Sequence, residues 1–247
     1  MPTWNPWHGC MKISPGCNHC YVYSRDAEFG KDASKVYKTT KFDLPLQKNR
    51  RKEYKLLQEE EPVYTCMTSD FFIKDADEWR RDAWMMMRAR EDLHFVIITK
   101  RIHRFPVSLP EDWGAGYENV TIMCAAENQS RADDRIPKLL ELPIRHKAII
   151  LEPMLEHINI EPYLASGQIE RVVCGGESGE DARVCDFAWI LDMMNQCVAY
   201  DVAFQFKQTG TLFKKGDKVY RIEQEDQTIQ AKKAGVDFDR NFNSGKE

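Results

Sequence analysis

The fold is decided by the stretch Val63-Tyr64-Thr65-Cys66-Met67-Thr68-Ser69-Asp70. Its first five residues predict a buried strand, and the three polar residues that follow predict a loop at the strand's carboxyl end. The same order of apolar run and polar end recurs along the chain. The other expected strands are residues 95–98, 120–124, 148–151, 171–174 and 203–206. Such strands, separated by segments long enough for crossover helices, indicate an α/β fold with a mainly parallel sheet of about six strands.

Helices are expected between these strands. A short one is predicted over residues 21–29, and a second, with charged faces, through Leu46, Tyr54 and Leu57. Asp77 and Asp186 are candidate caps for two more helices, since aspartate accepts hydrogen bonds from free amide groups at a helix start. Another helix is expected around residues 136–140, with Pro137 kinking it or starting its main part. The run of methionines at 85–87 is interpreted as core packing rather than a cofactor site.

Length and composition indicate one main domain. With 247 residues and 43% hydrophobic content, the chain can bury a substantial core, and α/β barrels of this size commonly form a single domain. We expect that domain over residues 1–210, including an N-terminal cysteine loop. Residues 211–247 form a C-terminal extension packed on the same domain, with an edge hairpin that turns at 214–217 and a polar end at 241–247.

Charge and hydropathy exclude several classes of protein. The apolar runs are too short to span a bilayer and no targeting segment follows Met1, which predicts a soluble, cytoplasmic protein with no membrane partner. The net charge of -4 argues against a uniformly basic nucleic-acid coat. Residues 31–55, however, hold nine Lys and Arg against three Asp and Glu, so cationic charge is concentrated in one stretch.

Three cysteines near the start of the chain have the spacing of metal ligands. Cys10, Cys17 and Cys20 are spaced C-x6-C-x2-C, and the Ser-Pro-Gly turn at 14–16 lets the chain fold back on itself. Thiolates suit zinc or iron–sulfur clusters, and three of them leave one metal position without a protein ligand. The alternatives are small buried residues, or a closed zinc site completed by His8 or His19. A secreted disulfide framework is disfavoured because the other cysteines are scattered in apolar runs, at 66, 124, 174, 185 and 197.

Polar residues follow six of the expected strands. In parallel α/β folds the ligand sits at the carboxyl ends of the strands. The residues at those ends are Ser69, Asp70, Thr99, Lys100, Arg101, Glu127, Glu152, Glu177, Ser178, Lys207 and Gln208. The diglycine Gly175-Gly176 is explained equally well by close approach of backbone to a ligand and by a tight turn. No dinucleotide fingerprint, P-loop, H-E-x-x-H or G-x-S-x-G motif occurs.

A family resemblance is carried by several blocks of the chain, from about Trp4 to about Gly210. The first blocks are Trp4-Asn5-Pro6, Gly9-Cys10, Ser14-Pro15-Gly16-Cys17 and Cys20-Tyr21. The later blocks are residues 68–72, 98–101, 131–137, 151–155, 175–179 and 206–208. In content and order they resemble the phage-associated three-Cys-motif family, a domain of unknown function found in phages and mobile elements. That family in turn resembles a divergent branch of the radical S-adenosylmethionine enzymes, which are partial (β/α) barrels.

The resemblance implies a [4Fe-4S] cluster held by Cys10, Cys17 and Cys20, with S-adenosylmethionine on its unique iron and a 5′-deoxyadenosyl radical as the reactive species. Cofactor-binding residues would be His19, Tyr21, Ser69, Glu127, Gly175, Gly176, Glu177 and Ser178. Catalytic residues would be Asp70, Lys100 and Glu152, and substrate-binding residues Arg101, Lys207 and Gln208. The usual radical-enzyme spacing is C-x3-C-x2-C, and the glycine-glycine-glutamate element usually follows an early strand, so this chain departs from the pattern in two places.

Two classes of function follow from these observations. The first is a radical S-adenosylmethionine-type enzyme acting on an unknown substrate, for which the basic stretch at 31–55 suggests a nucleic acid or nucleotide. A variant of it uses the cluster for electron transfer or sensing. The alternative is a non-catalytic zinc or iron–sulfur module that recognises a partner protein or nucleic acid. The resemblance also implies a co-encoded partner protein.

Overall fold

The computed structural model describes residues 2–57, 59 and 61–240. The chain forms two compact units, each assembled from several segments. Unit 1 comprises Met1–Ile13, Val22–Cys124 and Glu141–Lys147. Unit 2 comprises Ser14–Tyr21, Ala125–Leu140 and Ala148–Glu247. The expected polar end at 241–247 lies outside the described residues.

Unit 1 is built on parallel strands in the order β1-β4-β5-β6. These are β1 (Thr3–Trp4), β4 (Val63–Thr65), β5 (Phe95–Thr99) and β6 (Val120–Ala125). The small antiparallel pair of β2 (Trp7–His8) and β3 (Tyr37–Lys38) and the helices α1 (Tyr21–Glu28) and α2 (Asp77–Ala89) complete the regular structure. Buried aromatic rings fill the core, where Phe71 packs edge-on against Trp84 with the ring centroids 4.7 Å apart.

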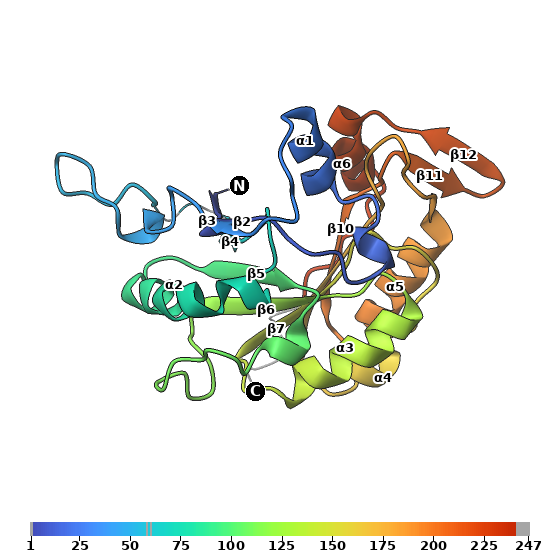
Figure 1. Cartoon of the computed structure of the whole chain (residues 1–247). Helices are drawn as coiled ribbons and strands as arrows, with labels where there is room; N and C mark the ends of the chain where they lie inside the picture. The colour runs from blue at the N-terminus through green and yellow to red at the C-terminus, as the bar shows by residue number, and fades with distance from the viewer. Residues whose placement is uncertain (1, 58, 60, 241–247) are drawn as a thin grey trace. The chain divides into compact units, whose positions relative to one another are not determined.

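In unit 2 the strand order is β7-β8-β10, and β8 and β10 are paired in parallel. Its strands are β7 (His146–Leu151), β8 (Ile169–Gly175) and β10 (Ala203–Gln208), and its helices are α3 (Gln129–Glu141), α4 (Glu161–Leu164), α5 (Phe187–Ala199) and α6 (Gln224–Lys233). Both α5 and α6 pack against β10 (Figure 1). A second sheet has the order β12-β11-β9, from Lys218–Arg221, Leu212–Lys215 and Cys185–Asp186.

The predicted α/β class with mainly parallel strands is confirmed. Seven strands belong to the parallel set, consistent with the expected partial barrel. All six predicted strands are present. Sequence reasoning missed β1 of this set and the short strands β2, β3 and β9 outside it, because two residues are too few to show a pattern. The strand at 63 ends at Thr65 rather than 67, since Cys66 takes a φ of 66°. None of the described helices has the length and apolar character needed to cross a membrane.

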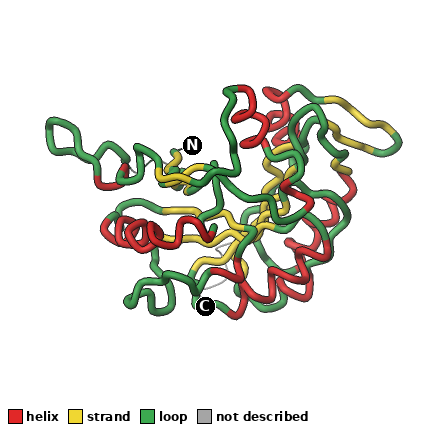
Figure 2. Tube along the Cα trace, in the orientation of Figure 1, coloured by secondary structure: helices red, strands yellow, loops and turns green. Residues whose placement is uncertain are grey.

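One predicted helix was wrong. The basic segment through Tyr54 is almost entirely loop, with a single 3-10 turn at Leu44–Leu46 (Figure 2). The Asn49 side chain accepts hydrogen bonds from the amides of Arg51 and Glu53, at 2.8 and 3.1 Å. Such local bonding offers the backbone an alternative to a helix, and it prevails here.

The two candidate cap residues behave differently. Asp186 caps α5 as predicted, because its carboxylate accepts the Ala188 amide at 2.9 Å. Asp77 is instead the first residue of α2. Its carboxylate binds Arg80 at 2.7 Å and Arg104 at 2.6 Å, so it joins elements together rather than capping one.

Candidate functional site

Asp70 is the centre of a buried polar cluster in unit 1. It follows β4, is 5% exposed, and its two carboxylate oxygens accept four hydrogen bonds. Oδ1 accepts from the Thr99 hydroxyl at 2.8 Å and the Phe72 amide at 2.9 Å. Oδ2 accepts from the Lys100 amide at 3.0 Å and the Arg101 guanidinium at 3.1 Å. The carboxyl ends of neighbouring strands β4 and β5 are therefore joined by one buried carboxylate, a structural role that the strand-end pattern did not predict.

Arg101 extends this cluster to the first cysteine. Its guanidinium donates to the Cys10 sulfur at 3.6 Å and to the Met11 carbonyl at 2.5 Å. Burial acts to lower the pKa of Arg101, but the charges of Asp70 and Cys10 act in the opposite direction and leave it raised. A cationic group therefore lies beside the Cys10 sulfur.

The backbone around Cys10 is fixed from several directions. The Cys10 amide donates to the Ala33 carbonyl at 2.8 Å, and the Cys10 carbonyl accepts from the Tyr23 hydroxyl at 2.5 Å. Ser69, a predicted cofactor contact, donates its hydroxyl to the Gly9 carbonyl. Lys100, a predicted catalytic residue, contributes its backbone amide to Asp70. These hydrogen bonds fix the backbone at Gly9 and Cys10, and so the position of the Cys10 thiol.

The other two motif cysteines lie in unit 2, on the segment 14–21, which is held by Glu127. The Gly16 amide donates to Glu127 Oε1 at 3.1 Å, and a Cβ at Gly16 would come within 3.1 Å of three atoms of that side chain. Glu127 is fully buried, and its other oxygen accepts from Arg135 at 3.0 Å. A buried charge is stable only when it is paired in this way, so the cysteine segment is docked on a neutralised carboxylate.

Glu177 makes the second attachment of this segment. Its carboxylate accepts from the Arg183 Nε at 2.8 Å and from His19 Nδ1 at 3.1 Å. Arg183 also donates to the Pro15 carbonyl at 3.1 Å. Burial acts to raise the pKa of Glu177, but the hydrogen bonds from Arg183 and His19 outweigh it and leave that pKa lowered. His19 was expected beside a cofactor, and here its ring is held by Glu177.

The strand-end residues on β7 and β10 form a more open cluster. Glu152 accepts from the Lys207 ammonium at 2.7 Å and from the Gln208 amide at 2.6 Å. The Lys207 side chain is 39% exposed and that of Glu152 is 15% exposed. Ser178 donates to Gln227 at 2.5 Å, beside the same strands. This cluster therefore combines an anionic group, a cationic group and amides that can bind a charged ligand.

The diglycine has a packing role that is independent of any ligand. A Cβ on Gly176 would lie 2.1 Å from the Thr209 carbonyl oxygen, and the Gly176 amide donates to the Gln208 carbonyl at 3.0 Å. At Gly175 a Cβ would meet Glu152 Oε1 at 2.9 Å. The second glycine is required because two backbone segments of the protein touch, which is neither the approach to a ligand nor the tight turn that the sequence suggested.

Exposure separates the eight cysteines into two groups. Cys10, Cys17 and Cys20 are half-buried, whereas the other five are buried, and none forms a disulfide. Burial raises the pKa of Cys66 and Cys174 well above the usual value and that of Cys185 and Cys197 to about 12, which makes these thiols unreactive. Tyr21, next to the third motif cysteine, is 53% exposed. Within the described residues no group of three or more His, Cys, Asp and Glu side chains is arranged to hold a metal ion.

The two histidines of the motif each have a carboxylate partner. His8 Nε2 lies 2.5 Å from Asp26, which is buried, and His19 Nδ1 lies 3.1 Å from Glu177. Metal-bound histidines are commonly oriented by such a carboxylate on the other ring nitrogen. These pairs therefore support the protein's structure and also remain compatible with the zinc alternative.

Comparison with known proteins assigns the family. A family model described as "Protein of unknown function (DUF5131)" matches residues 1–243. The chain belongs to this family. No curated protein and no solved structure matches the chain. The DUF5131 match includes both units and every residue of the clusters described above.

Sequence reasoning missed the arginines that complete these clusters. Arg135 neutralises Glu127 and Arg183 neutralises Glu177. Arg135 lies within the block at 131–137 that carried the family resemblance, so a signal for it was present. Arg183 follows no strand and no motif, and nothing local marks it. Its role depends on a loop that returns to Glu177 six residues earlier, which only the folded chain decides.

Proposed function

We propose that this protein is an iron–sulfur enzyme of the radical S-adenosylmethionine type, in a phage-associated branch marked by three cysteines. Cys10, Cys17 and Cys20 would hold a [4Fe-4S] cluster. The observation that carries the proposal is the division of the thiols: the three with the motif spacing are the ones that are not buried. Structural cysteines are typically buried and inert, whereas ligand thiols must be reachable as thiolates.

The three thiols are donors of the kind that hold a cluster, and binding it would require them to come together, since the described side chains form no ready-made group of three metal ligands. Three thiolates are the protein ligands of a [4Fe-4S] cluster with one open iron. When bound, the cluster and S-adenosylmethionine would supply one-electron cleavage of the sulfonium to a 5′-deoxyadenosyl radical. The chain's own contribution begins with Arg101, whose guanidinium donates to the Cys10 sulfur. Hydrogen bonds and positive charge at ligand sulfurs raise the reduction potential of such clusters, so Arg101 would ease electron entry.

The open cluster around Glu152 is our candidate for binding the charged end of S-adenosylmethionine. Lys207 offers a cation for a carboxylate, and Glu152 offers an anion for an ammonium group. Glu177 resembles the usual amine-binding glutamate, but its side chain is 5% exposed and is held by Arg183 and His19. Glu152 is also paired, with Lys207 at 2.7 Å, but these two side chains are 15% and 39% exposed, so a charged ligand can reach them. We therefore assign Glu177 to holding the cysteine segment and Glu152 to the ligand. Asp70 and Lys100 keep their proposed place in the catalytic set, and Arg101 in substrate binding.

Metal content tests the first step of the proposal. Protein purified without oxygen is expected to contain about four iron and four sulfide per chain. Cys10→Ser, Cys17→Ser and Cys20→Ser should each lose that iron, while the matched control Cys66→Ser should retain it. Equal loss from the control would mean that the wrong thiols were chosen.

Ligand binding tests the second step. S-adenosylmethionine should bind the iron-loaded protein in a calorimetric titration, and 5′-deoxyadenosine should appear after reduction. Glu152→Gln should weaken binding by about tenfold, the equivalent of about 1.4 kcal/mol, without changing the iron content. Full iron without any binding would leave a cluster used for electron transfer or sensing and would overturn the enzyme.

A zinc module is the second candidate. It is favoured by the two carboxylate-oriented histidines, His8 and His19, at the motif. One zinc per chain with no sulfide would establish it as a module that recognises a partner protein, such as one encoded alongside, or a nucleic acid. A cytoplasmic location fits either candidate, since all eight cysteines are free.

A further inference from the structure

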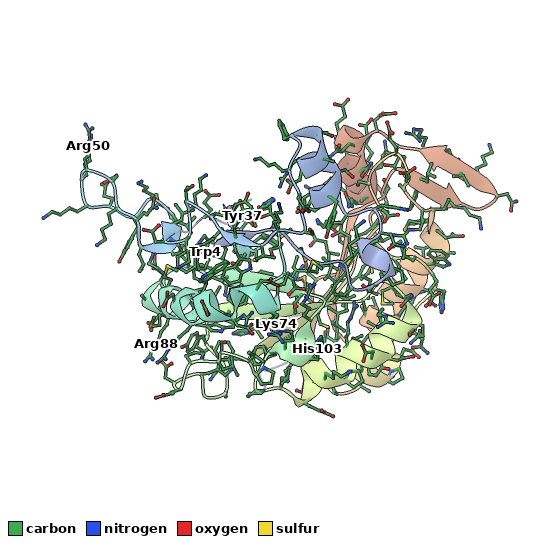
Figure 3. The ribbon with its side chains drawn as sticks, in the orientation of Figure 1. Trp4, Tyr37, Arg50, Lys74, Arg88 and His103 are labelled. Atoms are coloured by element: carbon green, nitrogen blue, oxygen red, sulfur yellow. The ribbon has the colours of Figure 1, made fainter. Side chains whose placement is uncertain are left out.

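The loop at residues 47–55 of unit 1 concentrates positive charge. It contains Lys48, Arg50, Arg51, Lys52 and Lys55, with Glu53 as its one acidic residue. All six of these side chains are exposed. In the described part of the chain, Arg50, Arg51 and Lys52 make no ion pair. Figure 3 shows Arg50 at the outer end of the loop, with its side chain pointing away from the ribbon.

A buried arginine anchors both stems of the loop. Arg90 is 1% exposed and donates to the Pro45 carbonyl at 2.5 Å on one stem and to the Leu56 carbonyl at 2.8 Å on the other. Its guanidinium also lies 3.9 Å from the centre of the Tyr54 ring. Burying a guanidinium is costly unless all its donors are used, and here they hold the loop's base in one geometry.

The loop is also closed internally. Lys48 and Tyr54 form an isolated antiparallel bridge, and the Asn49 amide donates to the Glu53 carbonyl at 2.8 Å. The Lys48 ammonium sits over the Tyr54 ring, and Lys55 donates to the Gln47 side chain at 3.1 Å. The stem cations therefore brace the loop, while the three at the tip remain available to a partner.

Lys52, at the tip, has a backbone conformation that is unfavourable for a residue with a long side chain. Lys52 has a φ of 65°, in the left-handed region that suits glycine or asparagine better than lysine. A turn selected only for stability would carry glycine at this position. Lysines that merely face solvent would also not need the buried Arg90 at the base of their loop. We therefore interpret the loop as a rigid support that holds its tip cations toward a binding partner.

We propose that the tip of this loop, Arg50, Arg51 and Lys52, binds the phosphate backbone of a nucleic acid. Three adjacent exposed cations can neutralise phosphates of such a backbone, and the neighbouring Glu53 carboxylate accepts a hydrogen bond from the Asn49 side-chain amide at 2.8 Å. The contact is independent of base sequence, since no groove-reading element accompanies the tip. This proposal rests on the proposed function in one respect, namely that the bound nucleic acid is the enzyme's substrate. Binding itself requires no iron–sulfur cluster.

The test is fluorescence anisotropy with labelled single-stranded DNA of about 30 nucleotides and with its duplex. The triple variant Arg50→Glu, Arg51→Glu, Lys52→Glu should bind at least about tenfold more weakly at low salt, and the slope of log K against log salt should fall by roughly 2 to 3. The matched control is Lys215→Glu, Lys218→Glu, Arg221→Glu on β11 and β12. Those residues are equally exposed and also lack ion pairs among the described residues, so this control should bind as the wild type does.

A single variant separates binding from folding. Lys52→Gly should leave thermal stability unchanged or raised, because glycine suits the backbone at this position, while it weakens DNA binding by about threefold. Equal affinities for the triple variant and its control would overturn the proposal. So would equally tight binding of polyglutamate of matched charge, which would make the partner an acidic protein. Repeating the titration on Cys17→Ser distinguishes the two proposals, since a failure of the cluster leaves DNA binding intact.

Discussion

Asp70→Asn replaces one oxygen of a buried carboxylate that accepts four hydrogen bonds with an amide nitrogen. The asparagine oxygen can still accept the bonds from Thr99 and Phe72, at 2.8 and 2.9 Å. Its amide group, however, would face the Lys100 amide and the Arg101 guanidinium, which are both donors. Losing a bond to a charged group costs about 1.5 to 3 kcal/mol, and an unsatisfied buried donor costs about 1 to 3 more. We therefore expect the free energy of unfolding to fall by about 3 to 5 kcal/mol.

Urea unfolding followed by tryptophan fluorescence measures this loss. Trp7 is a local reporter, since it is buried and its indole N–H donates to the Asp70 carbonyl at 3.3 Å. The matched control is Glu118→Gln, whose ion pair with Arg145 joins side chains that are 73% and 45% exposed. Exposed pairs contribute about 1 kcal/mol or less, so this control should barely move the midpoint.

A double-mutant cycle with Arg101→Gln sharpens the test. If the Asp70–Arg101 pair is the principal loss, the two substitutions should be non-additive by about 1 kcal/mol or more. A loss below about 1 kcal/mol for Asp70→Asn, or additive effects in the cycle, would refute the argument that a single buried charge joins β4 and β5.

Three further predictions concern the supports of the site. Because the pKa of Glu177 lies below its usual value of 4.5, the pair stabilises the fold above that pH and loses this contribution as pH falls through the folded pKa; Glu177→Gln should flatten the acid limb of unfolding midpoints measured against pH. An unchanged acid limb would show that Glu177 is not the group responsible. Gly176→Ala places a methyl group against the Thr209 backbone and should cost about 1 to 3 kcal/mol, measured as a lower melting temperature, while Gly175→Ala meets side chains that can move and should cost less. Equal melting temperatures would contradict the packing role. In metal-free folded protein, an aromatic disulfide reagent should modify three cysteines quickly and the remaining five only after unfolding, and a different count would contradict the division of the thiols.

Local sequence was sufficient for most of the regular structure. An apolar run such as Phe95–Thr99 and a periodic helix such as Phe187–Ala199 carry their pattern within a few residues, so period and cap residues identify them. The prediction failed in the loop at 47–55, where charged helix formers suggested a helix. There the Asn49 side chain and the distant Arg90 select a closed loop instead.

The strand-end rule also identified residues that contact the cysteine segments, such as Arg101, Glu127 and Glu177, but not what each one does. Glu127 and Glu177 were expected to bind a cofactor, and in the fold they hold the cysteine segment through Gly16 and His19. These contacts join residues that are more than one hundred positions apart in the chain. A pattern read from neighbouring residues contains no information about such pairs.

The sequence by itself determined the α/β class, the positions of the strands, the polar character of their carboxyl ends and the spacing of three candidate ligand thiols. These properties follow from side-chain periodicity and backbone preference, which act over a few residues. The tertiary structure alone decided which thiols are buried, which arginine neutralises each buried carboxylate and how Arg90 presents a cationic loop. Burial and ion pairing depend on the low-dielectric interior and on groups that only folding brings together. The free-energy cost of burying each charge therefore depends on a partner that is distant in the sequence.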